Sequence, residues 1–153
     1  MFDDGTLLKL SDHGFRWVCG DEYGGEWLKE QAKKKNYKVH IKNSTDQINN
    51  LSLQGPKSRE ILEKIIFTPP TQPSISELEW FRFSICRLEE LNGIPLIVSR
   101  TGYTGELGFE IWCHPSDAPT VWDKVMEAGK DEGLIPAGSV SYTHLTLPTN
   151  SRV

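Results

Sequence analysis

The sequence predicts an α+β fold, in which antiparallel or mixed sheets pack against helices and the chain forms two similar β-α-β-type halves. Short segments of alternating apolar residues, bounded by Gly, Asn and Asp, indicate strands. Longer segments with apolar residues three and four positions apart indicate amphipathic helices. These segments follow the order β-β-α-β and then β-α-β-β-β-α, which is typical of an α+β domain. No internal repeat is strong enough to establish a duplication.

The first half is predicted to begin with two strands, over residues 7–10 and 15–19. A helix is expected to follow over residues 25–35, with apolar residues on one face. Lysines crowd its last turn, where positive charge suits the helix dipole, and Asn36 is expected to end it. Residues 37–41 are predicted to form a third strand.

The second half is predicted to contain four strands, over residues 49–53, 80–88, 93–100 and 107–113. A helix over residues 56–66 is expected to open on a proline, because the first turn of a helix does not need that N–H group. A last helix, capped by Ser116, is expected to turn Val121, Trp122 and Val125 inward.

The composition indicates a globular chain of 153 residues with a net charge of −4. Nucleic-acid binders generally present a basic face, and a membrane span needs about 20 apolar residues; the sequence has neither. The first residues also lack a signal-peptide pattern. The odd, widely spaced cysteines predict reduced thiols, and the histidines have no metal-ligand spacing. We therefore expect a cytoplasmic protein with no nucleic-acid, membrane or metal partner.

The most specific feature is a turn within residues 99–111, where glycine recurs every third residue. Gly102, Gly105 and Gly108 are expected to let the backbone approach a flat ligand, because glycine has no Cβ and accepts positive φ. The spacing matches neither the dinucleotide pattern G-x-G-x-x-G nor a P-loop, so it does not favour a phosphate site. Glu106 instead favours a planar ligand whose edge offers N–H donors to a carboxylate.

Three blocks of the sequence together resemble the aminomethyltransferase family, which includes the T-protein of the glycine cleavage system and its tetrahydrofolate-binding relatives. Residues 100–110 resemble the most recognisable block of that family, and residues 53–58 (Leu-Gln-Gly-Pro-Lys-Ser) resemble one of its helix starts. The pair Asp3-Asp4 resembles the acidic pair that opens a strand in the folate-binding domain. The resemblance spans residues 2–138 and implies a partial folate-binding domain over residues 1–138.

The resemblance also implies that the chain is incomplete at both ends, because family members extend upstream of the acidic pair and continue with an arginine-bearing segment. Residues 139–153 resemble a translated sequencing adaptor instead, so we predict an artefactual tail, with a natural disordered terminus as the alternative. We expect the chain to be marginally stable and inactive alone, since it lacks the floor of the pocket and exposes sheet edges.

The activity that the resemblance implies is transfer of an aminomethyl unit to tetrahydrofolate, which serves as co-substrate, with no metal. Asp3 takes the catalytic role, in which a carboxylate raises the nucleophilicity of a folate nitrogen and stabilises positive charge. Glu106 is implied to bind the exocyclic amine and ring N–H of the pterin, with Gly105 and Tyr103 completing the folate-binding residues. Tyr103 either contacts the ring or braces the turn. For Asp3 and Glu106 the alternative is an ordinary solvated acid.

Two classes of function remain open. The first is an enzyme that takes its one-carbon unit from a lipoyl carrier protein or a small molecule, as an aminomethyltransferase or as a folate-dependent demethylase. The second is a non-catalytic folate-binding module attached to a dimethylglycine- or sarcosine-type dehydrogenase. Iron–sulfur-assembly relatives carry a cysteine in the block that corresponds to residues 100–110. This block has no cysteine here, which disfavours a role in iron–sulfur assembly.

Residues around the glycine block are predicted to be structural. Arg100 is expected to form an ion pair with Glu110 or another nearby carboxylate. At the family's asparagine after the second strand this chain has Gly20 or a neighbour, so the resemblance does not support a pterin-binding side chain there, and backbone groups of residues 19–21 are the alternative. The aromatic residues expected in the core are Phe109, Trp112 and Trp122.

Overall fold

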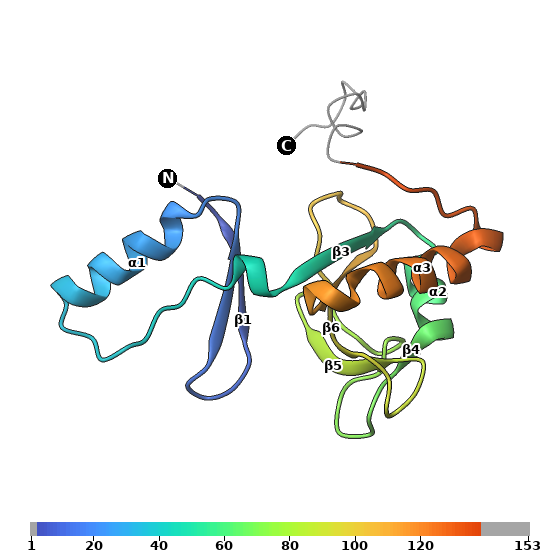
Figure 1. Cartoon of the computed structure of the whole chain (residues 1–153), viewed down its shortest axis with the longest axis horizontal. Helices are drawn as coiled ribbons and strands as arrows, with labels where there is room; N and C mark the ends of the chain where they lie inside the picture. The colour runs from blue at the N-terminus through green and yellow to red at the C-terminus, as the bar shows by residue number, and fades with distance from the viewer. Residues whose placement is uncertain (1–2, 139–153) are drawn as a thin grey trace. The chain divides into compact units, whose positions relative to one another are not determined.

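A computed structural model of the chain describes residues 3–138, drawn in colour in Figure 1. The chain divides into two compact units, residues 1–49 and residues 50–153, and each is described here by itself. The described residues form three α-helices, a two-stranded sheet and a five-stranded sheet. The predicted α+β class is therefore confirmed.

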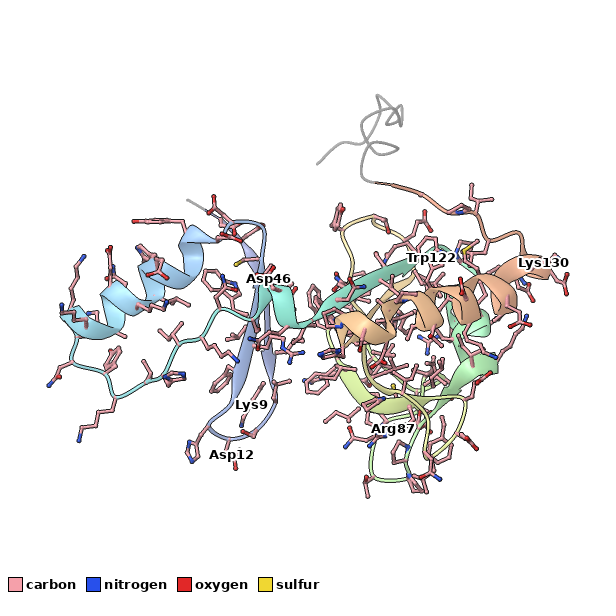
Figure 2. The ribbon with its side chains drawn as sticks, viewed as in Figure 1. Lys9, Asp12, Asp46, Arg87, Trp122 and Lys130 are labelled. Carbon is pink, nitrogen blue, oxygen red and sulfur yellow. The ribbon has the colours of Figure 1, made fainter. Side chains whose placement is uncertain are left out.

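Unit 1 consists of a hairpin, a helix and an irregular segment. Strands β1 (Gly5–Lys9) and β2 (Phe15–Cys19) pair antiparallel, with Leu7 opposite Trp17. Lys9 and Asp12 form an ion pair of 3.1 Å at the end of this hairpin (Figure 2). Helix α1 (Tyr23–Lys34) follows, and a short 3-10 helix η1 (Thr45–Gln47) ends the unit. The predicted stop at Asn36 is confirmed, because this residue adopts a positive φ of 55°.

The strand predicted over residues 37–41 is wrong, since this segment has no regular structure. Its alternating pattern fits a half-buried strand, but a strand needs a hydrogen-bonded neighbour. The sheet of unit 1 contains only β1 and β2 among the described residues. Tyr37 and Val39 are consequently 64% and 61% exposed.

Unit 2 is built on a sheet with the strand order β3-β7-β6-β5-β4. The bounds of these strands are β3 (Asn49–Gln54), β4 (Ile66–Phe67), β5 (Phe83–Leu88), β6 (Pro95–Ser99) and β7 (Gly108–Cys113). The pairs β4–β5, β5–β6 and β6–β7 are antiparallel. Ser99 lies opposite Glu110 in the last of these pairs, which confirms that the two strands pair back across the glycine turn.

Helices α2 (Ser58–Ile65) and α3 (Ala118–Gly129) lie side by side against this sheet (Figure 1). Two further 3-10 helices, η2 (Pro115–Asp117) and η3 (Lys130–Glu132), flank α3. The helices and strands share one continuous hydrophobic core, in which the side chains of Leu62, Val98, Phe109, Ile111 and Val121 are completely buried. This core holds the sheet that carries the glycine turn.

Several boundaries in unit 2 differ from the predicted ones. Helix α2 begins at Ser58 rather than at a proline, because the Ser58 N–H closes a turn onto the Gly55 carbonyl at 3.0 Å. Ser116 does not cap α3; its own N–H is instead accepted by His114 Nδ1 within η2. Trp122, on α3 in Figure 2, is 41% exposed, so its predicted place in the core is wrong.

No helix within residues 3–138 combines the length and the apolar character needed to cross a membrane. The tail predicted over residues 139–153 lies outside the described residues.

Candidate functional site

The five-stranded sheet of unit 2 has a second face that is largely polar. Successive side chains of a strand point to opposite faces, so the residues that alternate with Leu53, Phe109 and Ile111 face away from the core. We define this polar face as Asn50, Ser52, Gln54, Ser99, Glu110 and Trp112. The glycine turn, residues 101–107, leaves β6 and enters β7 at the end of this face.

A chain of hydrogen bonds crosses the polar face and ends on a carboxylate. Trp112 Nε1 donates to Ser99 Oγ at 3.1 Å, and Ser99 Oγ lies 2.8 Å from Thr101 Oγ1. The Thr101 hydroxyl donates to Glu110 Oε2, while Asn50 Nδ2 donates to Glu110 Oε1 at 2.9 Å. Because an indole only donates and a carboxylate only accepts, the hydroxyl protons run toward Glu110. The network thus joins β3, β6 and β7 where the glycine turn begins.

Gln54 braces the glycine turn through both ends of its amide. Its Nε2 donates to Ser52 Oγ at 3.0 Å and lies 3.4 Å from each of the carbonyl oxygens of Thr101 and Phe109. Its Oε1 accepts a hydrogen bond from Thr104 Oγ1 at 2.9 Å. A primary amide suits this position, because it donates to carbonyls at one end and accepts from a hydroxyl at the other.

Two of the three glycines make room for this amide rather than for a ligand. A Cβ atom added at Gly102 would lie 2.4 Å from Gln54 Oε1, and one added at Gly108 would lie 1.8 Å from it. This corrects the expectation that all three glycines admit a flat ligand. Gly105 is different, because its φ of 75° favours glycine and no atom lies within 4 Å of an added Cβ.

Glu106 stands next to this open glycine with an exposed side chain. Its backbone N–H is held by Thr104 Oγ1 at 3.4 Å, but within residues 3–138 its carboxylate has no hydrogen bond or ion pair. Tyr103 is 80% exposed, so most of its ring faces solvent, while Gln54 braces the turn through Thr104. The Glu106 carboxylate therefore keeps its full capacity to accept hydrogen bonds from an external donor.

The expected ion pair between Arg100 and Glu110 does not form. Arg100 Nη1 donates to the Leu78 carbonyl at 3.3 Å, and its guanidinium lies 5.7 Å from the centre of the Trp80 ring. These contacts hold the segment before β5 against the end of β6. Glu110 is satisfied instead by Thr101 and Asn50, as described above.

In unit 1, backbone N–H groups hold the carboxylate of Asp3. Its Oδ2 accepts from the N–H groups of Gly20 and Asp21, and its Oδ1 accepts from Asp4, each at 2.9 Å. These bonds, led by the one from Asp21, lower the pKa of Asp3 below its ordinary value of 3.8. Asp3 is therefore ionised at neutral pH, and its orientation is fixed by the corner between β2 and α1.

The corner after β2 has its donors occupied. The N–H groups of Gly20 and Asp21 both bind Asp3, so neither is available for the pterin contact that the sequence left to backbone groups. Cys19 lies beside them, half-buried, and its pKa is raised by burial and then by the charge of Asp3. Its sulfur is therefore a protonated thiol at neutral pH rather than a nucleophilic thiolate.

A separate hollow of about 260 Å³ lies in unit 1, and it contains none of the predicted site residues. It is lined by Lys29, Ala32, Lys33, Tyr37, Val39 and Ile41. In the described part of the chain, no three His, Cys, Asp or Glu side chains are grouped as a metal site requires.

The profile of the GCVT N-terminal domain matches residues 1–151. The chain belongs to this family. The resemblance drawn from the acidic pair, the Leu-Gln-Gly-Pro block and the glycine turn is thereby confirmed.

Three relatives of this GCVT N-terminal domain carry two different names. The chain is 51% identical over 138 residues to a trimethylamine-oxide aldolase of Ruegeria pomeroyi, which covers 90% of this chain and 18% of that protein. It is 47% identical over 141 residues to an aminomethyltransferase of Caldanaerobacter subterraneus subsp. tengcongensis, and the match covers 90% of this chain and 35% of that protein. An aminomethyltransferase of Thermoanaerobacter pseudethanolicus is 41% identical over 139 residues, and the match covers 89% of this chain and 35% of that protein. The chain thus spans only a minor part of each of these relatives.

Sequence reasoning identified the residues at the tip of the turn but missed those that hold it. Gln54 belongs to the block that resembles the family, but the sequence alone does not indicate its role. Its partner Thr104 is 50 residues away, and no local pattern indicates such a contact. The available signal was the pair of glycines at positions 102 and 108, which leaves space for a long polar side chain from another strand.

Proposed function

We propose that this chain is the tetrahydrofolate-binding part of a one-carbon transferase, with aminomethyl transfer as its reaction. Membership of the GCVT N-terminal domain family and the relatives named aminomethyltransferase support this proposal. The observation that carries it is the exposed carboxylate of Glu106, which has no hydrogen bond or ion pair within residues 3–138. It stands beside the open Gly105, on a turn that Gln54 holds.

The proposed role of Glu106 is to bind the edge of the pterin. The exocyclic amine and adjacent ring N–H form a pair of parallel donors, which suits the two oxygens of a carboxylate. Within residues 3–138 no donor competes for these oxygens. Gly105 leaves space beside the carboxylate, and the exposed ring of Tyr103 offers an aromatic surface for the flat ligand.

The proposed role of Asp3 is electrostatic rather than that of a general base. A general base works best with a pKa near the working pH, whereas the N–H groups of Asp21, Asp4 and Gly20 lower the pKa of Asp3. An acid that stays ionised and oriented can stabilise positive charge that develops on a reacting nitrogen. Bound tetrahydrofolate would supply the nucleophilic nitrogens that accept the one-carbon unit.

A second candidate function is folate-dependent demethylation of a small methylated amine. The 51% identity to a protein named trimethylamine-oxide aldolase favours it. Trimethylamine oxide carries its carbon as methyl groups on nitrogen, and an aminomethyl group also joins a single carbon to nitrogen. Both functions would therefore use the same carboxylates, and they differ in the donor, which is a small molecule in one case and a lipoyl carrier protein in the other.

A cytoplasmic location remains part of the proposal. Cys19, Cys86 and Cys113 are free thiols, as is usual in a reducing compartment. Burial raises the pKa of Cys86 to about 12, so this residue is an inert core thiol.

The first test is binding of tetrahydrofolate to the 153-residue chain, measured as a concentration-dependent rise in melting temperature. Glu106→Gln should weaken this binding about tenfold or more, because it removes charge-assisted hydrogen bonds. Glu90→Gln is the matched control, since Glu90 is another exposed acid of unit 2 outside the turn. Unchanged binding in Glu106→Gln would exclude the proposed role.

The second test separates catalysis from simple binding. In the complete gene product that carries this chain, Asp3→Asn should reduce turnover far more than it reduces tetrahydrofolate affinity. If Asp3→Asn changes neither, the non-catalytic folate-binding module becomes the better description. Comparing an aminomethyl-loaded lipoyl protein with trimethylamine oxide as one-carbon donors then distinguishes the two candidate reactions.

A further inference from the structure

We propose that Gln54 is a positioning residue of the folate site, which fills the slot between Gly102 and Gly108 and, through Thr104, fixes the backbone that carries Glu106. The proposal rests on the proposed function, because it assumes that Glu106 binds the pterin. It adds to that function a residue that lies outside the glycine turn and touches no expected ligand atom.

A short path of hydrogen bonds connects the two residues. The Glu106 N–H donates to Thr104 Oγ1 at 3.4 Å, and the same hydroxyl donates to Gln54 Oε1 at 2.9 Å. The other end of the Gln54 amide faces the carbonyls of Thr101 and Phe109 at 3.4 Å. Gln54 therefore contacts the beginning, the middle and the far side of the turn from one strand.

The residues that follow Gln54 add a second attachment. The Gly55 N–H donates to the Leu107 carbonyl at 2.7 Å, and Ser58 Oγ donates to the same oxygen at 3.3 Å. The block 54–58 thus holds the turn on both sides of Glu106. A binding carboxylate needs such support, because a site must be held to about 0.5 Å to keep its geometry.

The chemistry of the slot requires an amide. Gln54→Glu would place a carboxylate oxygen against the carbonyls of Thr101 and Phe109, where no proton remains to be shared. Gln54→Met would keep the length of the side chain but remove all of its hydrogen bonds. Both changes should loosen the turn while leaving the hydrophobic core intact.

The slot is tested by combining a substitution in its wall, at Gly108, with one of the side chain that fills it, Gln54. Gly108→Ala should lower the melting temperature by about 5 °C or more, because the new methyl group overlaps the Gln54 amide. In the Gln54→Ala background the same change should lower it by much less, since the amide is gone. Equal losses in both backgrounds would show that Gly108 does not make room for Gln54. This test needs no ligand, so it is independent of the proposed function.

The positioning role is tested by tetrahydrofolate affinity in a double-mutant cycle on the 153-residue chain. Gln54→Met should weaken binding about tenfold, but should add little to the loss already caused by Glu106→Gln. Glu90→Gln is the control, since Glu90 is an exposed acid of unit 2 outside both the turn and the slot, and this variant should bind like the unmodified chain. Equal weakening by Gln54→Met in both backgrounds would overturn the positioning role. No effect of Glu106→Gln itself would instead refute the proposed function, whatever the result for the slot.

Discussion

The two units hold their candidate acids in opposite ways. In unit 1 the carboxylate of Asp3 accepts hydrogen bonds from the backbone N–H groups of Asp4, Gly20 and Asp21. In unit 2 the carboxylate of Glu106 has no partner among the described residues, and the fold holds only the turn on which it stands. An acid kept ionised and oriented suits charge stabilisation, whereas an acid kept unpaired suits recognition of an external donor.

The units also differ in what supports these arrangements. Unit 2 has a continuous core that joins the sheet to α2 and α3, and Gln54 extends from a strand of that sheet. Among its described residues, unit 1 has Leu8 as its only buried apolar side chain, while Phe15, Trp27 and Tyr37 are exposed. The Asp3 site therefore depends on hydrogen bonds that water can replace, and it belongs to the less stable unit.

The largest difference in stability between the units should appear when one phenylalanine in each is changed to alanine. Phe109 is completely buried, so Phe109→Ala should lower the free energy of unfolding by about 3–5 kcal/mol. Phe15 is 56% exposed, and Phe15→Ala should change it by no more than about 0.5 kcal/mol. Urea denaturation of both variants measures the difference. Similar losses would mean that unit 1 has a core comparable to that of unit 2.

A smaller effect is expected where a hydroxyl supports the glycine turn. Thr101 is 4% exposed and donates to Glu110, so Thr101→Val should lower the free energy of unfolding by about 1–3 kcal/mol. Thr45→Val in unit 1 removes an exposed hydroxyl that binds Asn43 and is the matched control. Amide exchange should also become faster within residues 102–108 of the Thr101 variant only. A stable turn in that variant would show that the polar network does not anchor it.

Local patterns predicted most of the strands and the exposed residues of the glycine turn, because these features are encoded by neighbouring residues. The bounds of β2 were predicted to the residue, and β6 and β7 were placed on either side of the glycine turn. The segment 37–41 has the same kind of pattern but no neighbouring strand, so its prediction failed. Sheet pairing is a tertiary property, and an alternating sequence cannot report whether a partner exists.

The same limit explains the errors at the site. Arg100 and Glu110 have opposite charges and lie in one block, so an ion pair was a natural prediction. The structure gives Glu110 two neutral donors, from Asn50 on another strand and from Thr101. The role of Gln54 likewise depends on β3 lying next to β7, which the sequence alone did not indicate.

The smallest effect should be the loss of the Asp3 hydrogen bonds in unit 1 when the pH is lowered. The pKa of Asp3 is lowered by its bonds to Asp21, Asp4 and Gly20, so the stabilisation they provide is fully present above the ordinary value of 3.8. It is lost as the pH falls through the lowered pKa, because a protonated carboxyl group accepts these N–H bonds more weakly. The amide proton shifts of Gly20 and Asp21, followed by NMR from about pH 6 to about pH 2, should therefore titrate together below that ordinary value.

Two variants make this titration specific to Asp3. Asp3→Asn should abolish the coupled shift changes at Gly20 and Asp21, because the group that titrates is gone. Asp12→Asn removes an exposed acid of the same unit, the partner of Lys9, and should leave the changes in place. Titration of Gly20 and Asp21 near or above 3.8 would mean that their N–H groups do not stabilise the ionised form. The contrast with the unpaired acid of unit 2 would then disappear, since neither carboxylate would be held by the fold.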